Sequence, residues 1–188
     1  TVEHIKIFAQ IAGIKTLGYI YTSNEANSIS SLELVKKGCE QAGIKLVSQS
    51  ITKSDEVKQA ADSIVSRVDG LYLTTDNTVF SALASVIGVF NKAKKPIFSG
   101  DVTGAQQGGI FMASGFNYYK AGLATADIIA ELIGGKKPAS IPVKFITKPE
   151  DSDLLFDLDT AKECGITIPE DYLSKANMIY QGGKLTTK

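Results

Sequence analysis

Charge of a single sign, arginine and long apolar runs are all scarce in this sequence. Lys+Arg and Asp+Glu each number 20, so the formal net charge is +0. Nucleic acids and anionic membranes attract proteins with a basic excess, and this balance argues against both as partners. Arg67 is the single arginine, although arginine is the residue best suited to bidentate phosphate recognition. No apolar run reaches the ~18 residues of a membrane span. We find no signal peptide either and expect any export signal to lie outside this chain.

Histidine and cysteine are nearly as scarce. His4 is the only histidine, which excludes a zinc site built from several histidines and argues against a Ser-His-Asp triad. Cys39 and Cys164 lack the spacing of a metal site, and both fall on the apolar side of a predicted helix. We interpret them as buried small hydrophobic residues, and the sequence leaves open whether they form a disulfide.

The composition is that of a globular domain, with 44% hydrophobic and 21% charged residues over a length of 188. Between residues 15 and 101, apolar segments with strand and helix periodicity alternate. This βαβαβαβ series predicts an α/β fold with a doubly wound parallel sheet, helices on both faces and a strand order of 2-1-3-4. After a first helix at 2–12, we predict strands at 15–21, 45–51, 70–74 and 96–99, and helices at 28–42, 54–68 and 78–93.

The alternation changes after residue 101. A glycine-rich loop at 102–109 leads into a short apolar strand at 109–114 rather than into a helix. A helix is predicted at 118–133, and its apolar face is formed by Ala121, Ala124, Ile128 and Leu132. The remaining predictions are a connector at 136–142, a strand at 143–147, a polar linker at 148–153, a helix near 157–164 and a short element at 170–180.

Short polar residues gather after the first, third and fourth predicted strands, where an open parallel sheet binds its ligands. Ser28, Asp55 and Thr78 are expected to cap helices, but capping needs one such residue per helix and leaves a surplus. Helix N-termini behind these loops suit a carboxylate, and Asp76 and Asp101 suit an ammonium, so the edge suits a zwitterion. The predicted ligand-binding residues are Ser23, Asn24, Glu25, Asn27, Ser28, Thr75, Asp76, Asn77, Gly100 and Asp101.

Enzymatic interpretations have less support. The sequence contains no P-loop, no G-x-G-x-x-G after a strand and no G-x-S-x-G, so we expect no enzyme activity and no cofactor. Glu25, Asp76 and Asp101 could form an acid cluster like that of receiver domains. Tyr21 and Thr22, however, stand where that cluster needs adjacent acids.

Several segments resemble the ABC transporter substrate-binding family, which includes tryptophan- and other aromatic amino-acid-binding lipoproteins. The resemblance runs in order through residues 18–28, 69–79, 95–101, 117–122, 141–143 and 161–169. Two positions depart from the family pattern: Asp157 stands where the family usually has Asn, and Asn117 where it often has Asp.

The resemblance implies a two-lobed, type I periplasmic-binding fold that clamps its ligand between the lobes. Residues 1–115 would form the second, ligand-binding lobe. Residues 116–147 would be a helix and strand belonging to a first lobe that is largely absent here, and residues 148–188 the return crossover and C-terminal elements. We therefore expect this chain to be the C-terminal portion of a longer protein, and the face of the helix at 118–133 to seek another partner, such as a second copy of the chain.

The function implied is that of the solute-binding component of an ABC importer, in the periplasm or anchored as a lipoprotein on the cell surface. It would bind a small molecule, an amino acid such as an aromatic one, and deliver it to an ABC permease. A ligand-sensing receptor domain of the same fold and, with less support, an α/β enzyme are the alternatives that the sequence leaves open.

Overall fold

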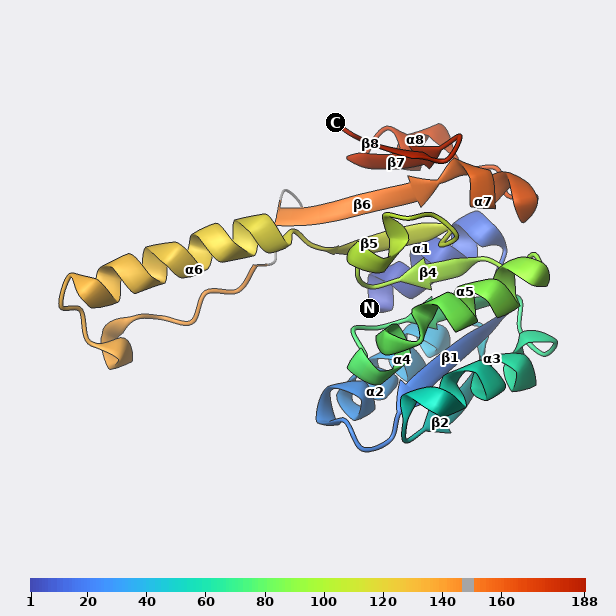
Figure 1. Cartoon of the computed structure of the whole chain (residues 1–188), viewed down its shortest axis with the longest axis horizontal. Helices are drawn as coiled ribbons and strands as arrows, with labels where there is room; N and C mark the ends of the chain where they lie inside the picture. Colours follow the sequence, from blue (N-terminus) through green and yellow to red (C-terminus); the bar gives the residue numbers. More distant parts are fainter. Residues whose placement is uncertain (147–150) are drawn as a thin grey trace.

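A computed structural model describes residues 1–146 and 151–188. Its centre is a mixed sheet of eight strands in the order β2-β1-β3-β4-β5-β6-β7-β8 (Figure 1). The strands are β1 (Thr16–Thr22), β2 (Lys45–Ile51), β3 (Gly70–Leu73), β4 (Ile97–Ser99), β5 (Met112–Phe116), β6 (Ser152–Asp157), β7 (Met178–Gln181) and β8 (Lys184–Thr187). The helices are α1 (Val2–Ala12), α2 (Ala26–Ala42), α3 (Val57–Val65), α4 (Asn77–Ser81), α5 (Leu83–Lys92), α6 (Tyr118–Ile133), α7 (Leu158–Glu163) and α8 (Glu170–Leu173), with short 3-10 turns at Ser54–Glu56, Thr103–Ala105 and Pro138–Ser140.

The parallel part of the sheet is confirmed. Strands β2, β1, β3, β4 and β5 pair in parallel, with Leu17 of β1 opposite Leu46 on one side and Gly70 on the other. Strand β6 pairs antiparallel with β5, β7 parallel with β6, and β8 antiparallel with β7. The predicted order 2-1-3-4 therefore holds, and the carboxyl ends of the first five strands meet at one edge.

Apolar side chains cover both faces of the sheet. Ile20 and Leu71 belong to the core that packs against α3, α4 and α5, whereas Tyr19 and Phe98 belong to the core that packs against α1 and α2. Tyr19 and Ile20 are neighbours in β1 and enter opposite cores because successive strand residues point to opposite faces. Both faces are buried, which explains why the strands are continuous apolar runs in the sequence.

Most predicted boundaries agree with the structure to within a few residues. Helix α2 ends at Gly43, which adopts the left-handed conformation (φ 67°) that glycine accommodates at low cost. The predicted helix at 78–93 is instead two helices, α4 and α5, because Ala82 leaves helical geometry (φ −118°, ψ 22°). Both pieces keep the same apolar side, so periodicity does not reveal the break.

Three predictions beyond residue 130 need correction or refinement. The predicted linker at 148–153 overlaps β6 at residues 152–153, because the apolar centre of β6 has only three residues, 154–156, and does not stand out as a strand. Residues 148–150 lie outside the described residues. The predicted strand at 143–147 is wrong over 143–146, which has no regular structure because it has no neighbouring strand to pair with; residue 147 lies outside the described residues. The short element at 170–180 comprises α8 and most of β7, and the hairpin β7–β8 completes the sheet.

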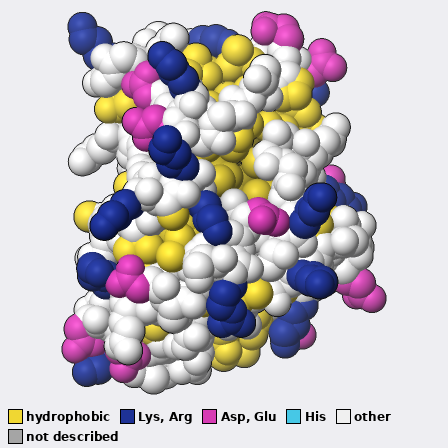
Figure 2. All heavy atoms as spheres, turned by 90° about the vertical axis from the view of Figure 1, so that its right-hand side faces the viewer, with side chains coloured by type: hydrophobic (Ala, Val, Ile, Leu, Met, Phe, Trp, Pro, Cys, Tyr) yellow, Lys and Arg dark blue, Asp and Glu magenta, His cyan; other side chains and the backbone are white. Residues whose placement is uncertain are grey.

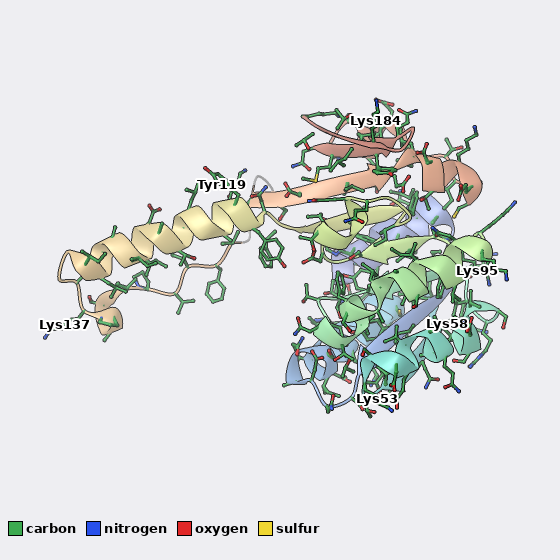
Figure 3. The ribbon with its side chains drawn as sticks, viewed as in Figure 1. Lys53, Lys58, Lys95, Tyr119, Lys137 and Lys184 are labelled. Carbon is green, nitrogen blue, oxygen red and sulfur yellow. The ribbon has the colours of Figure 1, made fainter. Side chains whose placement is uncertain are left out.

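Helix α6 and residues 134–146 form an arm that leaves the rest of the molecule, here called the body (Figure 1, left). The helix spans the predicted residues 118–133, yet none of its residues is buried. Tyr119 is 76% and Ile133 82% exposed, and Phe145 on the returning segment is 79% exposed. Figure 3 shows Tyr119 at the base of the arm and Lys137 near its far end.

The surface of the body carries no dominant charge on the face opposite the arm. Lysine side chains are scattered over it, with acidic side chains among them (Figure 2). In the ranges 1–146 and 151–188 no helix combines the length and hydropathy of a membrane span. Cys39 and Cys164 are both free thiols in the structure, Cys39 buried and Cys164 partly exposed.

Candidate functional site at the carboxyl ends of the strands

A cavity of about 470 Å³ opens at the edge where the parallel strands end. The loops after β3 and β4 and the end of β5 form its floor, α1 and α2 form one side, and the base of the arm forms the other. The lining residues are Thr1, His4, Ser31, Tyr72, Thr74, Thr75, Gly100, Ser114, Gly115, Phe116, Ile146 and Ser152. The cavity thus lies where open parallel sheets bind ligands.

Aromatic rings form one wall of the cavity. The ring of His4 stacks on Phe98 with centroids 4.9 Å apart, and its Nδ1 lies 3.0 Å from the hydroxyl of Tyr72. Burial lowers the pKa of His4 to about 4, so its ring is neutral at pH 7. Phe116 is 43% exposed, and its ring centroid lies 4.7 Å from that of Tyr118. Part of this wall is therefore open to a ligand.

Asp76 sits behind the cavity and joins three elements of the body. Its carboxylate accepts hydrogen bonds from the backbone N–H of Thr22 (2.7 Å), the hydroxyls of Thr22 and Ser28 (2.7 Å each) and the backbone N–H of Val79 (3.0 Å). The last of these bonds caps α4. Asp76 is 1% exposed, so protein donors occupy both of its oxygens in this structure.

Asp101 is arranged in a similar way at the base of the arm. Its carboxylate accepts hydrogen bonds from the backbone N–H of Thr103 (2.7 Å), from the Thr103 hydroxyl and from the Tyr118 hydroxyl (2.5 Å). The bond to Asp101 raises the pKa of Tyr118 to about 12. Gly115 passes so close that a Cβ on it would lie 2.8 Å from the carbonyl oxygen of Gly100. Asp101 therefore connects the end of β4 to the first turn of α6.

A second pair of residues fixes the other side of the same junction. Asn117 caps α6 by accepting a hydrogen bond from the backbone N–H of Lys120 (3.0 Å). Its amide donates to both carboxylate oxygens of Asp153 (3.0 Å each), which also accepts from the Asn177 amide (2.7 Å). Asp153 is 5% exposed. The N-terminal end of α6 is therefore hydrogen-bonded to β6 as well as to the loop after β4.

The other predicted site residues mostly bind neighbouring loops. The hydroxyl of Ser23 donates to Ile51 O (3.1 Å), and the Asn27 amide donates to Thr75 O (3.0 Å). The carboxylate of Glu25 accepts from the Thr78 hydroxyl (2.5 Å). Asn24 is exposed and its amide donates to Thr52 O (3.5 Å), while Asn77 is exposed in the first turn of α4.

The predicted helix caps are wrong in detail. Helix α2 begins at Ala26, before Ser28, whose hydroxyl instead binds Asp76. Asp76 caps α4, and Thr78 lies inside its first turn. Asp55 lies within a 3-10 turn ahead of α3 and makes no cap bond there. The error arises because several consecutive polar residues could each cap, and the sequence does not say which one the tertiary structure uses for another bond.

Of the ten predicted site residues, only Thr75 and Gly100 line the cavity. The sequence interpretation missed the lining residues on α1, α2, β5 and β6. Ser31 could have been found because it lies three residues after Ser28 on the same face of α2. Ser114 follows the buried Ala113 in β5, and strand alternation places it on the opposite face of the sheet.

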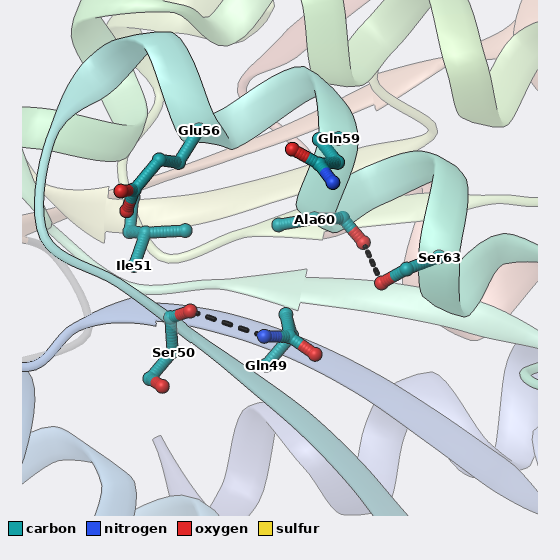
Figure 4. Close-up of a pocket in the computed structure, with 7 residues that line it drawn as sticks. All are labelled: Gln49, Ser50, Ile51, Glu56, Gln59, Ala60 and Ser63. Atoms are coloured by element: carbon teal, nitrogen blue, oxygen red, sulfur yellow. Dashed lines mark hydrogen bonds between the residues drawn. The ribbon is translucent and has the colours of Figure 1, made fainter.

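Another hollow, of about 290 Å³, lies between β2 and α3 and is less suited to a ligand (Figure 4). Three of its polar side chains already bind the local backbone: Ser63 donates to Ala60 O (2.7 Å) and Gln49 donates to Ser50 O (3.2 Å). Glu56 accepts from the backbone N–H of Thr52 (2.7 Å). Within the described part of the chain, no group of three or more His, Cys, Asp or Glu side chains is placed to hold a metal.

Comparison with known proteins shows which family the chain matches. Residues 1–179 match the family described as ABC transporter substrate binding protein. A tyrosine-binding protein from Clostridioides difficile (strain R20291) is 30% identical over 162 residues, which are 86% of this chain and 45% of that protein. The match bears out the resemblance inferred from the sequence segments.

Two solved structures are also similar. A conserved domain protein from Vibrio cholerae is 35% identical with a TM-score of 0.84, covering 96% of this chain and 60% of that one. An ABC domain in complex with L-Trp from Streptococcus pneumonia is 27% identical with a TM-score of 0.85, covering 95% and 59%. The chain thus spans about half the length of the relatives it matches.

More distant similarity concerns the fold alone. A periplasmic solute binding protein of an ABC transporter from Actinobacillus succinogenes, with bound D-allose, is 16% identical. Its TM-score is 0.59, over 86% of this chain and 58% of that one. The predicted fold class, α/β and similar to type I periplasmic-binding proteins, is confirmed.

Proposed function

Because the chain belongs to the ABC transporter substrate-binding protein family, we propose that it is the ligand-binding lobe of an extracytoplasmic solute-binding protein that delivers a small molecule to an ABC permease. The observation that carries this proposal is the cavity at the carboxyl ends of the strands, bordered by rings and hydroxyls. A concave site that combines aromatic rings with several hydrogen-bonding groups is suited to a small molecule.

The proposed ligand is an amino acid, and an aromatic one fits best. Two relatives are named for binding tyrosine and L-Trp. In the cavity wall, Phe116 is 43% exposed and His4 is partly exposed, and both offer aromatic contacts worth about 0.5–1.5 kcal/mol per pair beyond area burial. We propose binding without catalysis, because Asp76 and Asp101, which follow the lining residues Thr75 and Gly100, are already held by protein donors.

We also propose that the body and arm divide between two lobes. Residues 1–115 would form the second lobe, residues 116–147 a crossover into the first lobe, and residues 148–188 the return. The exposed apolar side chains of α6 support this assignment, because an uncovered apolar helix face of this size marks an interface. Without such a cover, the arm would drive two copies to associate, which light scattering of the 188-residue chain would detect as a dimer.

Calorimetric titration tests the binding proposal. The protein should bind L-tyrosine or L-tryptophan saturably and bind D-allose and ribose weakly or not at all. Phe116→Ala should weaken amino-acid binding about tenfold, the equivalent of one lost aromatic contact. Phe145→Ala is the matched control, because Phe145 is 79% exposed on the arm and does not line the cavity.

Four results would contradict parts of the proposal. Binding of sugars alone would exclude the amino-acid ligand, and turnover of a bound metabolite would favour an enzyme. Equal effects of Phe116→Ala and Phe145→Ala would show that the ligand does not sit in this cavity. If the ligand-loaded protein does not stimulate ligand uptake by the permease, the sensor alternative would be favoured over the importer.

A further inference from the structure

The cavity wall contributed by this chain has almost no charge. Apart from the terminal amino group of Thr1, none of its lining residues carries a charge at neutral pH, since His4 has a pKa of about 4. Asp101 is adjacent to Gly100 of the wall, but its carboxylate is occupied by Thr103 and Tyr118. Apart from the Thr1 amino group, the wall offers no partner of opposite charge to an ammonium or carboxylate, which would lose its hydration there.

The wall does offer hydroxyls without partners. Tyr72 and Thr74 use their hydroxyls on His4 and Tyr19. The hydroxyls of three serines, by contrast, make no hydrogen bond within residues 1–146 and 151–188, although each lines the cavity. These are Ser31 of α2, Ser114 of β5 and Ser152 of β6.

The three serines come from elements that are far apart in the sequence, and the fold brings them together at this cavity. A hydroxyl both donates and accepts, so it can pair with a phenol or an indole N–H as well as with water. A ligand that displaces water from such a hydroxyl loses affinity unless it forms a hydrogen bond in place of the water's. The hydroxyl therefore favours ligands with a hydrogen-bonding group at that position.

We propose that this wall binds the uncharged part of the ligand and that its serine hydroxyls recognise a hydrogen-bonding group there. For an amino acid this part is the side chain, and the ammonium and carboxylate are then bound by residues outside this wall. The inference rests on the proposed amino-acid function. It adds that this chain recognises the side chain of the amino acid rather than its ammonium and carboxylate.

The test uses pairs of ligands that differ by a single hydrogen-bonding group. L-tyrosine is paired with L-phenylalanine, and L-tryptophan with benzothienylalanine, whose ring has sulfur in place of the N–H. Dissociation constants are measured for the wild-type protein and for the variant Ser31→Ala/Ser114→Ala/Ser152→Ala. Ser30→Ala is the control, because Ser30 is an exposed neighbour of Ser31 that does not line the cavity.

The expected result is a loss of selectivity. The wild-type protein should prefer the hydrogen-bonding member of at least one pair, and the triple variant should reduce that preference about 3- to 10-fold, the worth of one net hydrogen bond. Esterifying the ligand carboxylate should cost the same factor in both proteins, since the serines do not hold it. Ser30→Ala should leave every ratio unchanged.

Two results would overturn the inference while leaving the binding function intact. One is equal binding of both members of each pair by the wild-type protein. The other is an equal loss of affinity for both members in the triple variant, as expected if the serines hold the charged groups. Failure of all four amino acids to bind, with a sugar binding instead, would overturn the amino-acid function and this inference with it.

Discussion

Both the body and the arm contain helices with a periodic apolar pattern, but only in the body are the apolar side chains buried. Helices α2 and α6 have 17 and 16 residues. Helix α2 buries Leu32, Val35 and Cys39 against the sheet, whereas α6 buries nothing. An amphipathic pattern therefore tells which face of a helix is apolar, but not whether this chain supplies the surface that covers it.

The same contrast holds for charged side chains. Asp76 in the body is 1% exposed and accepts hydrogen bonds from three residues of three elements. Asp127 on the arm is exposed, and its carboxylate has no hydrogen-bond or ion-pair partner among the described residues. Removing the two carboxylates one at a time would therefore measure how differently the two regions depend on their polar groups.

The largest expected effect comes from Asp76→Ala. It should lower the free energy of unfolding by about 3–5 kcal/mol, because buried donors on Thr22, Ser28 and Val79 lose their acceptor together. Asp127→Ala should change it by less than about 0.5 kcal/mol. Urea denaturation monitored by circular dichroism measures both.

A different result for Asp76→Ala would revive the interpretation suggested by the sequence. If the main role of Asp76 were to bind an ammonium, its removal would weaken ligand affinity and cost only about 1 kcal/mol of stability as a lost helix cap. Measuring affinity and unfolding on the same variant separates the two.

The second-largest effect is a pH dependence of the free energy of unfolding, caused by His4 in the body. Burial lowers the pKa of His4 to about 4, from an ordinary value of 6.5. Below pH 6.5 the unfolded chain binds a proton that the folded chain does not, so the stability contributed by neutral His4 is complete above pH 6.5 and falls as the pH falls towards 4. Between pH 6.5 and 5 the loss should be about 2 kcal/mol.

His4→Phe provides the control for this pH dependence. It keeps a ring that can stack on Phe98 and removes the titrating group, although it loses the bond to the Tyr72 hydroxyl. The variant should be less stable at pH 7 but lose less stability between pH 6.5 and 5. An identical pH dependence in the two proteins would show that His4 is not the group responsible.

The smallest expected effect concerns the junction between the regions. Tyr118→Phe removes the hydroxyl that binds Asp101 and should lower the free energy of unfolding by about 1 kcal/mol. Tyr119→Phe is a matched control at the next position, where the ring is 76% exposed and no hydrogen bond is made within the described ranges. Equal effects of the two substitutions would mean that the bond to Asp101 contributes nothing.

The sequence was informative wherever one residue pattern had one structural solution. Strand β2, helix α1 and helix α6 begin and end where periodicity predicted. The parallel order of β2, β1, β3 and β4 follows from the alternation of strands and helices. These features depend on local periodicity and chain connectivity, both of which the sequence contains directly.

The sequence was less informative where several consecutive polar residues could each take the same structural role. Polar residues after β1 and β3 could cap helices, join loops or face a ligand, and the structure uses most of them to join loops. The cavity is instead lined by residues such as Ser31 and Ser114, whose significance depends on tertiary contacts between distant segments. The segment 143–146 fails as a strand for a similar reason, since a strand requires a partner that the pattern does not reveal.

Hydrogen exchange of the 188-residue chain tests the comparison between body and arm most directly. The backbone amides of β1, β3 and β4 should exchange at the rate set by global unfolding, because they lie between two apolar cores. Amides of α6 should exchange orders of magnitude faster, because the described residues leave no side chain of this helix buried. Equal protection of α6 and the central strands in a monomeric sample would contradict the account, since it would mean that the arm is stable without the partner surface proposed for it.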